Sequence, residues 1–173
     1  HRPGACFTLI KDAFPTTSVH ELGHNLGFYH ASTETNGYGD DSSPMGSRRQ
    51  WKGYNAANRH SAGWLTDEHI ERVTASKQIM LRSLHDTPQA LGARSAAVFV
   101  CPECDPAYPN LEIWVSYRRG GGYDADLPPS MRDKVSIRWK KLNSNSLNLG
   151  TKIETFLSAG ESFTVTETGH QIR

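Results

Sequence analysis

Three histidines and a glutamate lie close together in the segment SVHELGHNLGFYHAS. His20 and His24 are four residues apart, so a helix through this segment places both imidazoles on one face, one turn apart. Gly27 then ends the helix as a C′ glycine does, and the bend lets His30 approach the same point. Such an arrangement can supply three nitrogen ligands to one Zn²⁺ ion at roughly 2.0–2.1 Å. The spacing therefore predicts a metal site formed by His20, His24 and His30.

The number of ligands and the neighbouring Glu21 indicate a catalytic site. Three protein ligands leave a fourth position for water, as in catalytic and not structural zinc sites. Zinc lowers the pKa of that water from about 15.7 towards about 7, so a carboxylate such as Glu21 suffices as general base. Two plainer interpretations stay open, because histidine pairs often decorate surfaces and Ser18 with Glu21 imitates a capping box. The full HExxHxxGxxH pattern fixes five residues at set offsets and favours the zinc site.

The composition is that of a globular protein with one ordinary domain or two small ones. The 173 residues are 36% hydrophobic and 21% charged, and the formal net charge is +1. No block of like charges indicates a nucleic-acid or membrane-surface partner. No window holds the roughly 18 apolar residues that a membrane span requires.

The pattern of apolar residues changes near residue 68. Before it, one helix is expected from about Thr17 to Leu26, with Val19, Leu22 and Leu26 on the side opposite the histidines. After it, short runs with strand-like alternation follow one another: QIMLRSLH, AAVFVC, LEIWVSYR, KVSIRWKK, TKIETFL and ESFTVTE. In the third run, Leu111, Ile113, Val115 and Tyr117 share one face, and Glu112, Ser116, Arg118 and Trp114 share the other. Six runs without intervening helices favour an antiparallel β-sandwich or open barrel.

The cysteines leave several interpretations open. Cys101 and Cys104 form a CPEC motif, which suits a disulfide or structural loop cysteines, half of a metal knuckle, or a redox pair. The proline-rich loop that follows, and the lack of nearby matching ligands, favour the structural interpretation. Cys6 lies fourteen residues before His20, where a thiolate would be able to cap the metal.

Several segments resemble one family of peptidases. HELGHNLGFYHA has the metzincin zinc-binding pattern, and metzincins carry a methionine turn downstream of it, a place that YGDDSSPMG supplies here. Together with YNAANRHSAGWL, these segments resemble the gametolysin (autolysin) family, secreted metallopeptidases of volvocine green algae that digest the glycoprotein cell wall or extracellular matrix. The resemblance covers most of the chain and is tightest from residue 16 to 65.

The resemblance implies a role for each matching residue. His20, His24 and His30 match the zinc ligands, Glu21 the general base, Gly27 the bend, and Met45 the turn beneath the metal. Ser47 stands where some metzincins have a metal-proximal tyrosine, so Tyr54 is the nearest candidate for stabilising the transition state, although a packing role suits it better. The acidic residues Asp40 and Asp41 are expected in a solvated turn.

The expected fold is α+β: residues 1–68 form the C-terminal half of a metzincin-like catalytic domain, and residues 69–173 form a β-rich domain. Because only 19 residues precede His20, we expect an N-terminally incomplete member of the family. The resemblance implies a secreted zinc endopeptidase acting on extracellular matrix or cell-wall glycoproteins. The alternative is a non-catalytic matrix- or carbohydrate-binding β module, using Trp114, Trp139 and several tyrosines expected to be exposed, with a vestigial zinc site.

Overall fold

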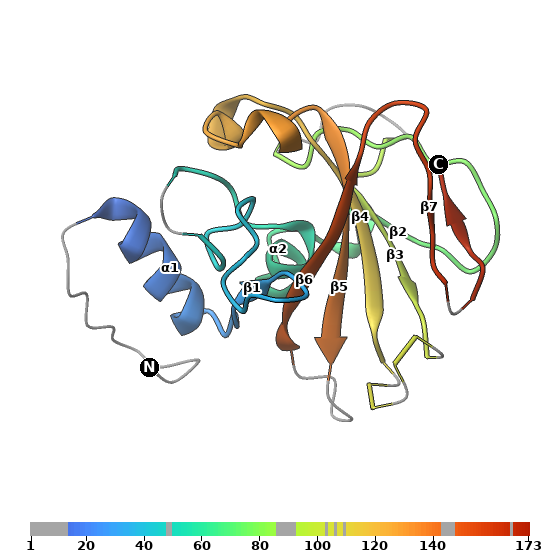
Figure 1. Ribbon diagram of the computed structural model, residues 1–173, viewed down its shortest axis with the longest axis horizontal. Coiled ribbons are helices and arrows are strands. Elements are labelled where there is room, and N and C mark those ends of the chain that lie inside the picture. The colour runs from blue at the N-terminus through green and yellow to red at the C-terminus, as the bar shows by residue number, and fades with distance from the viewer. Residues whose placement is uncertain are drawn as a thin grey trace.

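The computed structural model describes residues 14–47, 50–85, 93–102, 104–105, 107–108, 110–142, 148–166 and 168–173. It is a mixed α+β structure (Figure 1). Its helices are α1 (Pro15–Asn25) and α2 (Ala56–Ser61), with 3₁₀ turns at Asp67–His69, Gly122–Asp124 and Pro129–Met131. Its strands are β1 (Ala31–Ser32), β2 (Ile70–Arg72), β3 (Ala96–Val100), β4 (Glu112–Arg118), β5 (Lys134–Leu142), β6 (Asn148–Leu157), β7 (Phe163–Thr164) and β8 (Gln171–Ile172). Cys6 lies outside the described residues.

The strands form one six-stranded sheet, in the order β1-β6-β5-β4-β3-β2, and a separate β7-β8 ribbon. Strands β3 to β6 are antiparallel, whereas the edge strands β1 and β2 run parallel to their neighbours. The expected sandwich or barrel is therefore not confirmed. The run QIMLRSLH, at residues 78–85, makes only isolated bridges at Leu81 and Ser83. Because β1 belongs to the first 68 residues and pairs with β6, both proposed regions contribute to one sheet, and the domain boundary stays a prediction.

Both faces of the central sheet are buried. Ile113, Ile137 and Leu157 form an apolar cluster with Val165, and the β7-β8 ribbon packs against it through partly buried Phe163 and Ile172. On the opposite face, Trp114 packs against Ala56 and Ala57 of α2. Val98 of β3 and Ile70 of β2 belong to the same apolar cluster, and β4 and β5 add buried polar side chains to this face: Glu112, Ser116, Arg118, Ser136, Arg138 and Lys140. The predicted alternation along β4 is confirmed, but its polar face lies under α2 and the loops around it.

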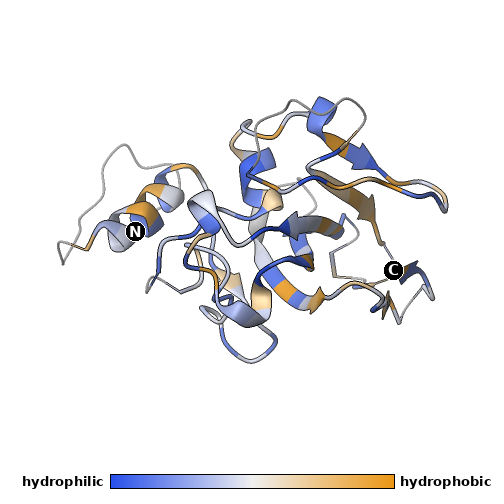
Figure 2. Cartoon of the chain, turned by 90° about the horizontal axis from the view of Figure 1, so that it is seen from above, coloured by the Kyte–Doolittle hydropathy of each residue, from blue (hydrophilic) through white to orange (hydrophobic). Residues whose placement is uncertain are grey.

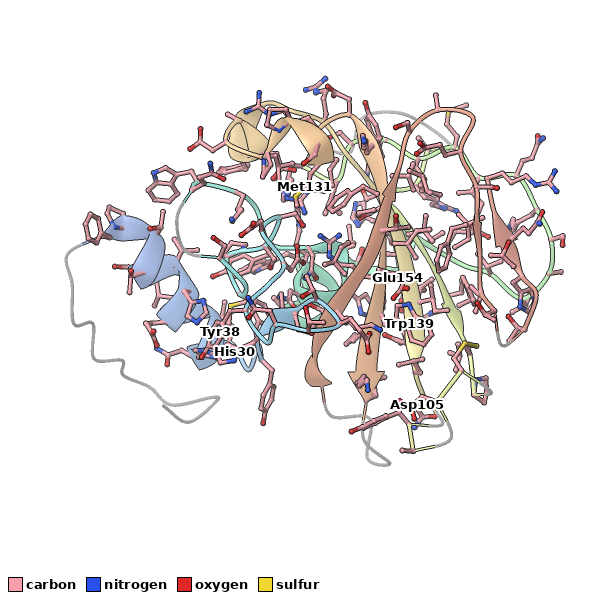
Figure 3. All side chains as sticks on the ribbon, viewed as in Figure 1. His30, Tyr38, Asp105, Met131, Trp139 and Glu154 are labelled. Atoms are coloured by element: carbon pink, nitrogen blue, oxygen red, sulfur yellow. A yellow bond between two sulfur atoms is a disulfide. The ribbon has the colours of Figure 1, made fainter. Side chains whose placement is uncertain are left out.

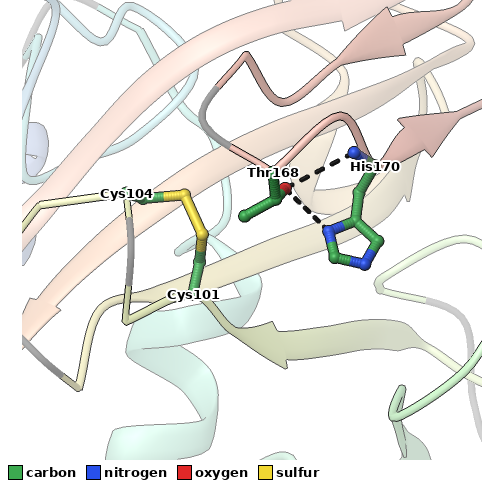
Figure 4. The surroundings of a disulfide bond; sticks show 4 residues. All are labelled: Cys101, Cys104, Thr168 and His170. Atoms are coloured by element: carbon green, nitrogen blue, oxygen red, sulfur yellow. Dashed lines mark hydrogen bonds between the residues drawn. A yellow bond between two sulfur atoms is a disulfide. The ribbon is translucent and has the colours of Figure 1, made fainter.

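Cys101 and Cys104 form a disulfide just after β3 (Figure 4). Cys101 is buried in the apolar cluster beneath the β7-β8 ribbon, and Cys104 packs against the same cluster. Near the disulfide, the backbone N–H of His170, next to β8, donates to Thr168 Oγ1 at 3.4 Å, and the ring Nδ1 of His170 lies 2.7 Å from the same oxygen. Of the interpretations left open by the CPEC motif, the disulfide is the one that the structure contains.

Helix α1 lies at one end of the molecule, beyond the edge of the sheet (Figures 1 and 2). It begins at Pro15, a residue suited to the first helical position because its fixed φ is preorganised, with Phe14 as N-cap. Ser18 therefore lies inside the helix, and the capping-box interpretation of Ser18 and Glu21 is wrong. Leu22 and Leu26 are 51% and 47% exposed. Across the part of the chain that the structure describes, neither helix has the length and apolar character needed to span a bilayer.

A cluster of buried charges lies beside the polar face of the sheet. Arg118 donates from Nε and Nη2 to both carboxylate oxygens of Asp124 at 2.6 Å. Arg59 Nη1 donates to His85 Nδ1 at 2.5 Å, so the imidazole carries its proton on Nε2, which lies 3.4 Å from Asp124 Oδ2. Desolvation lowers the pKa of His85 to about 4, since the opposing effect of Asp124 is weaker than burial and the two arginines.

His85 should make the stability of the fold depend on pH between about 4 and 6.5. In this window the unfolded chain binds a proton at His85 and the folded chain does not, so stability rises with pH. Acidification through this window lowers the free energy of unfolding by up to about 3 kcal/mol. We expect the free energy of unfolding, measured in urea, to differ between wild type and His85→Gln by an amount that grows from about pH 4 to about 6.5 and is constant above it. A difference that does not change with pH would contradict the lowered pKa of His85.

Candidate metal centre

The two helical histidines lie on one face of α1, as their spacing predicts. His20 is 3% exposed and His24 is 9% exposed, and their ring centroids are 4.9 Å apart. The His30 ring lies 5.5 Å from that of His20 and 4.9 Å from that of His24. One ligand atom from each of the three residues lies within 4.8 Å of the others. The structure therefore brings all three predicted ligands together.

The end of α1 turns the chain back towards this point. Gly27 has φ +83°, its N–H donates to His24 O at 3.0 Å, and the N–H of Phe28 donates to Gly23 O at 2.9 Å. These two bonds define a Schellman motif, in which glycine takes the left-handed position without steric cost. The predicted bend at Gly27 is present.

The sheet fixes the backbone beside the third histidine. His30 O accepts from Thr151 N of β6 at 3.2 Å, and the next residue, Ala31, pairs with Thr151 in the parallel β1-β6 register. Gly150 has φ +114°, and a Cβ there would lie 2.9 Å from His30 O. His30 is thus held by a strand more than a hundred residues downstream, and Figure 3 shows it at the end of α1 beside Tyr38.

Backbone carbonyls orient the two helical rings. His20 Nδ1 lies 2.7 Å from Pro44 O, and His24 Nδ1 lies 2.7 Å from Phe28 O. A carbonyl only accepts, so each Nδ1 carries the ring's proton in the neutral form. Each Nε2 then keeps its lone pair for a metal, which is how metal-binding histidines are usually fixed. Burial also lowers the pKa of His24, against the opposing effects of Phe28 O and Glu21.

The donor set fits a divalent metal such as zinc. Three imidazoles, two of which are buried and have Nδ1 against a backbone carbonyl, are typical ligands for zinc. Two nitrogens on one zinc ion can be at most about 4.2 Å apart, so binding requires the rings to close by less than about 1 Å from their present spacing.

Glu21 lies on α1 one residue after the first histidine and is half-buried. It is three residues from His24, a spacing that makes two side chains neighbours on a helix surface. The Glu21 charge acts to raise the pKa of His24, which shows that the carboxylate lies near that ring. This position suits the predicted general base.

Met45 lies fully buried beneath α1, in a small cluster with Phe28 and Ala31. A Cβ added at Gly23 would lie 2.3 Å from Met45 Sδ and 3.2 Å from Tyr54 Cε1, so the helix passes directly over the methionine. Gly23 was not predicted as a site residue. In the sequence it is a glycine in a helix interior, where glycine costs about 1 kcal/mol relative to alanine and therefore needs a packing reason. The methionine turn itself stays a prediction.

The two tyrosines near the centre occupy different places. Tyr54, the predicted candidate for stabilising a transition state, donates its hydroxyl to Val19 O at 2.6 Å and packs on Phe28. Burial raises the pKa of Tyr54 to about 12, so these contacts support a packing role. Tyr38, which sequence reasoning missed, is half exposed, and its ring centroid lies 4.0 Å from that of His30. The one feature of the sequence that could have indicated Tyr38 is that it is an aromatic residue among small polar ones.

Comparison with known families matches most of the chain to one family model. The family model described as Gametolysin peptidase M11 matches residues 5–166. The matched range contains the histidine triad, Glu21 and strands β1 to β7. No curated protein and no solved structure matches the chain. Membership of a metallopeptidase family implies a metal-dependent centre and protein substrates.

We expect the purified chain to bind one divalent metal ion and to be stabilised by it. At a free metal concentration of about 100 times Kd the gain is about 2.7 kcal/mol, which raises Tm by roughly 5–10 °C for a chain of this size. Elemental analysis and thermal unfolding, with and without chelator, measure both effects. His30→Ala should lose the ion and the shift. His69→Ala, at a partly exposed histidine bonded to Thr66, should keep both; retention of both by His30→Ala would contradict the site.

Gly23→Ala should destabilise the chain although alanine favours helices. The propensity gain of about 1 kcal/mol is opposed by a methyl group placed 2.3 Å from the buried Met45 Sδ, and overpacking costs about 1–3 kcal/mol. We expect chemical denaturation to give a net loss of about 1 kcal/mol and weaker metal binding. Ser18→Ala, in the same helix, is the control. Equal stabilisation by both changes would show that Met45 does not crowd Gly23.

Proposed function

This chain belongs to the gametolysin peptidase M11 family, and from that premise we propose that it is a zinc endopeptidase of extracellular matrix or cell-wall glycoproteins. The observation that carries the catalytic part is the arrangement on α1. His20 and His24 have Nδ1 against backbone carbonyls, His30 completes a triad of ligand atoms, and Glu21 follows His20 on the helix.

The chemistry divides between the ion and the side chains. A zinc ion held by His20, His24 and His30 would polarise the scissile carbonyl and acidify the attacking water. Glu21 accepts the proton that the water loses as its oxygen bonds to the carbonyl carbon. Glu21 then donates this proton to the leaving nitrogen as the C–N bond breaks, which restores the carboxylate.

Two of the histidines, His20 and His24, contribute by being held in one orientation. Their Nδ1–H groups donate to Pro44 O and Phe28 O, which prevents ring rotation and leaves the ligand positions preorganised. Burial of His20 and His24 excludes competing water from their rings. Preorganised groups in a water-poor site stabilise developing charge without a further reorganisation cost.

The substrate class and the extracellular location follow from the resemblance to gametolysins. The disulfide between Cys101 and Cys104 supports an extracellular location, because disulfides persist mainly in oxidising compartments. A non-catalytic binding module was the alternative, based on Trp114, Trp139 and several tyrosines, and its two tryptophans do not support it. These side chains are 1% and 9% exposed, so both belong to the core and neither offers a surface on which a sugar ring can stack.

Glu21→Gln should separate metal binding from catalysis. The amide keeps the size of the side chain and removes the base, so we expect one bound zinc ion and a loss of roughly 10²- to 10⁴-fold in kcat. Hydrolysis of casein or gelatin by the zinc-loaded chain, with and without chelator, measures this. Glu34→Gln, at an exposed glutamate paired with Lys152, is the matched control and should cleave normally.

Each failure has a distinct meaning. Normal cleavage by Glu21→Gln would remove Glu21 from the mechanism. Zinc binding by a wild-type chain that cleaves nothing would contradict the endopeptidase proposal while leaving the metal site intact.

A further inference from the structure

Residues 40–47, called here the Pro44 loop, carry two parts of the metal centre. Pro44 O is the carbonyl that lies 2.7 Å from His20 Nδ1. Met45 packs beneath α1, and its carbonyl accepts from Ala31 N at 2.9 Å. The position of the Pro44 loop therefore sets the orientation of one metal ligand and connects to the backbone beside another.

Asp40 holds this loop together from inside. Its side chain is fully buried, and Oδ1 accepts from Ser42 N at 2.9 Å and from Ser42 Oγ at 2.5 Å. Its backbone N–H donates to Ala31 O at 3.2 Å, and its carbonyl accepts from Ser43 N at 3.2 Å and Ser47 N at 3.4 Å. The prediction that Asp40 lies in a solvated turn is wrong, because the turn is folded around the Asp40 carboxylate.

Arg138 ties the Pro44 loop to the centre of the sheet. Its Nε donates to Asp40 Oδ2 at 3.2 Å and its Nη2 to Asp40 Oδ1 at 3.4 Å, and the same Nη2 donates to Ser42 Oγ. Arg118, on the neighbouring strand, donates from Nη2 to Ser42 O at 3.1 Å. Two buried guanidinium groups on β4 and β5 thus bind one short segment of the loop.

The free-energy cost of burying this ion pair indicates that its role is to fix the position of the Pro44 loop. Desolvation alone would raise the pKa of the Asp40 carboxyl, but Arg138 and the Ser42 hydrogen bonds together hold it below its ordinary value. Removing two charges from water costs several kcal/mol per ion, and buried ion pairs often stabilise no more than apolar residues of the same volume. The best-attested use of such a pair is to fix one register among several.

We infer that Asp40 and Arg138 are positioning residues of the metal centre. Their ion pair fixes the Pro44 loop on the sheet, and the loop's Pro44 carbonyl holds His20 in the Nδ1–H form with Nε2 directed to the ion. The inference rests on the proposed zinc function. The contacts run from β5 through the Pro44 loop to His20, and they involve no other residue of α1.

The first test reads the His20 tautomer in the metal-free protein. Imidazole ¹⁵N shifts at about pH 8, above the ordinary histidine pKa of about 6.5, report which ring nitrogen carries the proton. In Asp40→Asn and in Arg138→Lys, His20 should lose its preference for the Nδ1–H form. His24 is the internal control, because its carbonyl partner is Phe28 and not the Pro44 loop, and it should keep that form.

The second test measures metal affinity against a matched ion pair. Glu112 and Lys140 form a comparable pair on the same sheet face, 3.4 Å apart with side chains 12% and 8% exposed. We expect Asp40→Asn and Arg138→Lys to raise the Kd for zinc by about tenfold, as loss of a ligand-orienting partner does, and Glu112→Gln to change it by less than about twofold.

The outcomes separate the two claims. Unchanged His20 shifts in either folded charge variant, or unchanged zinc affinity with reduced stability, would overturn the positioning role and leave the zinc proposal standing. If both charge variants unfold, Ser42→Ala decides, since it removes only the hydroxyl shared by the pair; a normal His20 tautomer there overturns the inference. A wild-type chain that binds no zinc would overturn the proposed function, whereas the tautomer result stands on the metal-free protein alone.

Discussion

Arg118 and Arg138 project from neighbouring central strands onto the face of the sheet that the loops cover. In the described residues between α1 and α2, β1 is the one strand, so buried carbonyls of the surrounding loops need donors beyond a regular ladder. A guanidinium supplies several N–H groups in one plane, and Arg118 Nη2 reaches both Ser42 O and Gly53 O. The apolar cluster beneath α1 is small, so these charged contacts, and not apolar burial, give the loops a unique position.

The parts of the site that depend on neighbouring residues were open to prediction from the sequence. The i, i+4 spacing of His20 and His24 needs only helical geometry, and the bend at Gly27 needs only a helix end. Strands β4 and β5 follow from period-2 alternation along a single run. Family resemblance then gave roles that spacing alone leaves open, and the match over residues 5–166 agrees with it.

The parts that depend on distant pairing were not open to such prediction. Asp40 reads as a turn residue until Arg138, 98 positions away, is placed beside it. The sequence predicts Trp114 at the surface because Glu112 and Ser116, on the same face of β4, are polar, but both of these residues are buried as well. The sandwich was expected because alternation identifies strands without identifying their partners, so the parallel edge strands β1 and β2 left no trace in the pattern.

The pairing of β1 with β6 also determines when the third metal ligand can be fixed as the chain is synthesised. His30 is fixed by Thr151, and contacts of such long sequence separation carry the largest loop-closure entropy and form slowly. A growing chain that has exposed all three histidines to solvent still lacks the strand that holds the third one. The third ligand of the candidate metal centre is therefore fixed only after Thr151 has been synthesised, so the complete histidine triad forms later than the helix that carries its first two members.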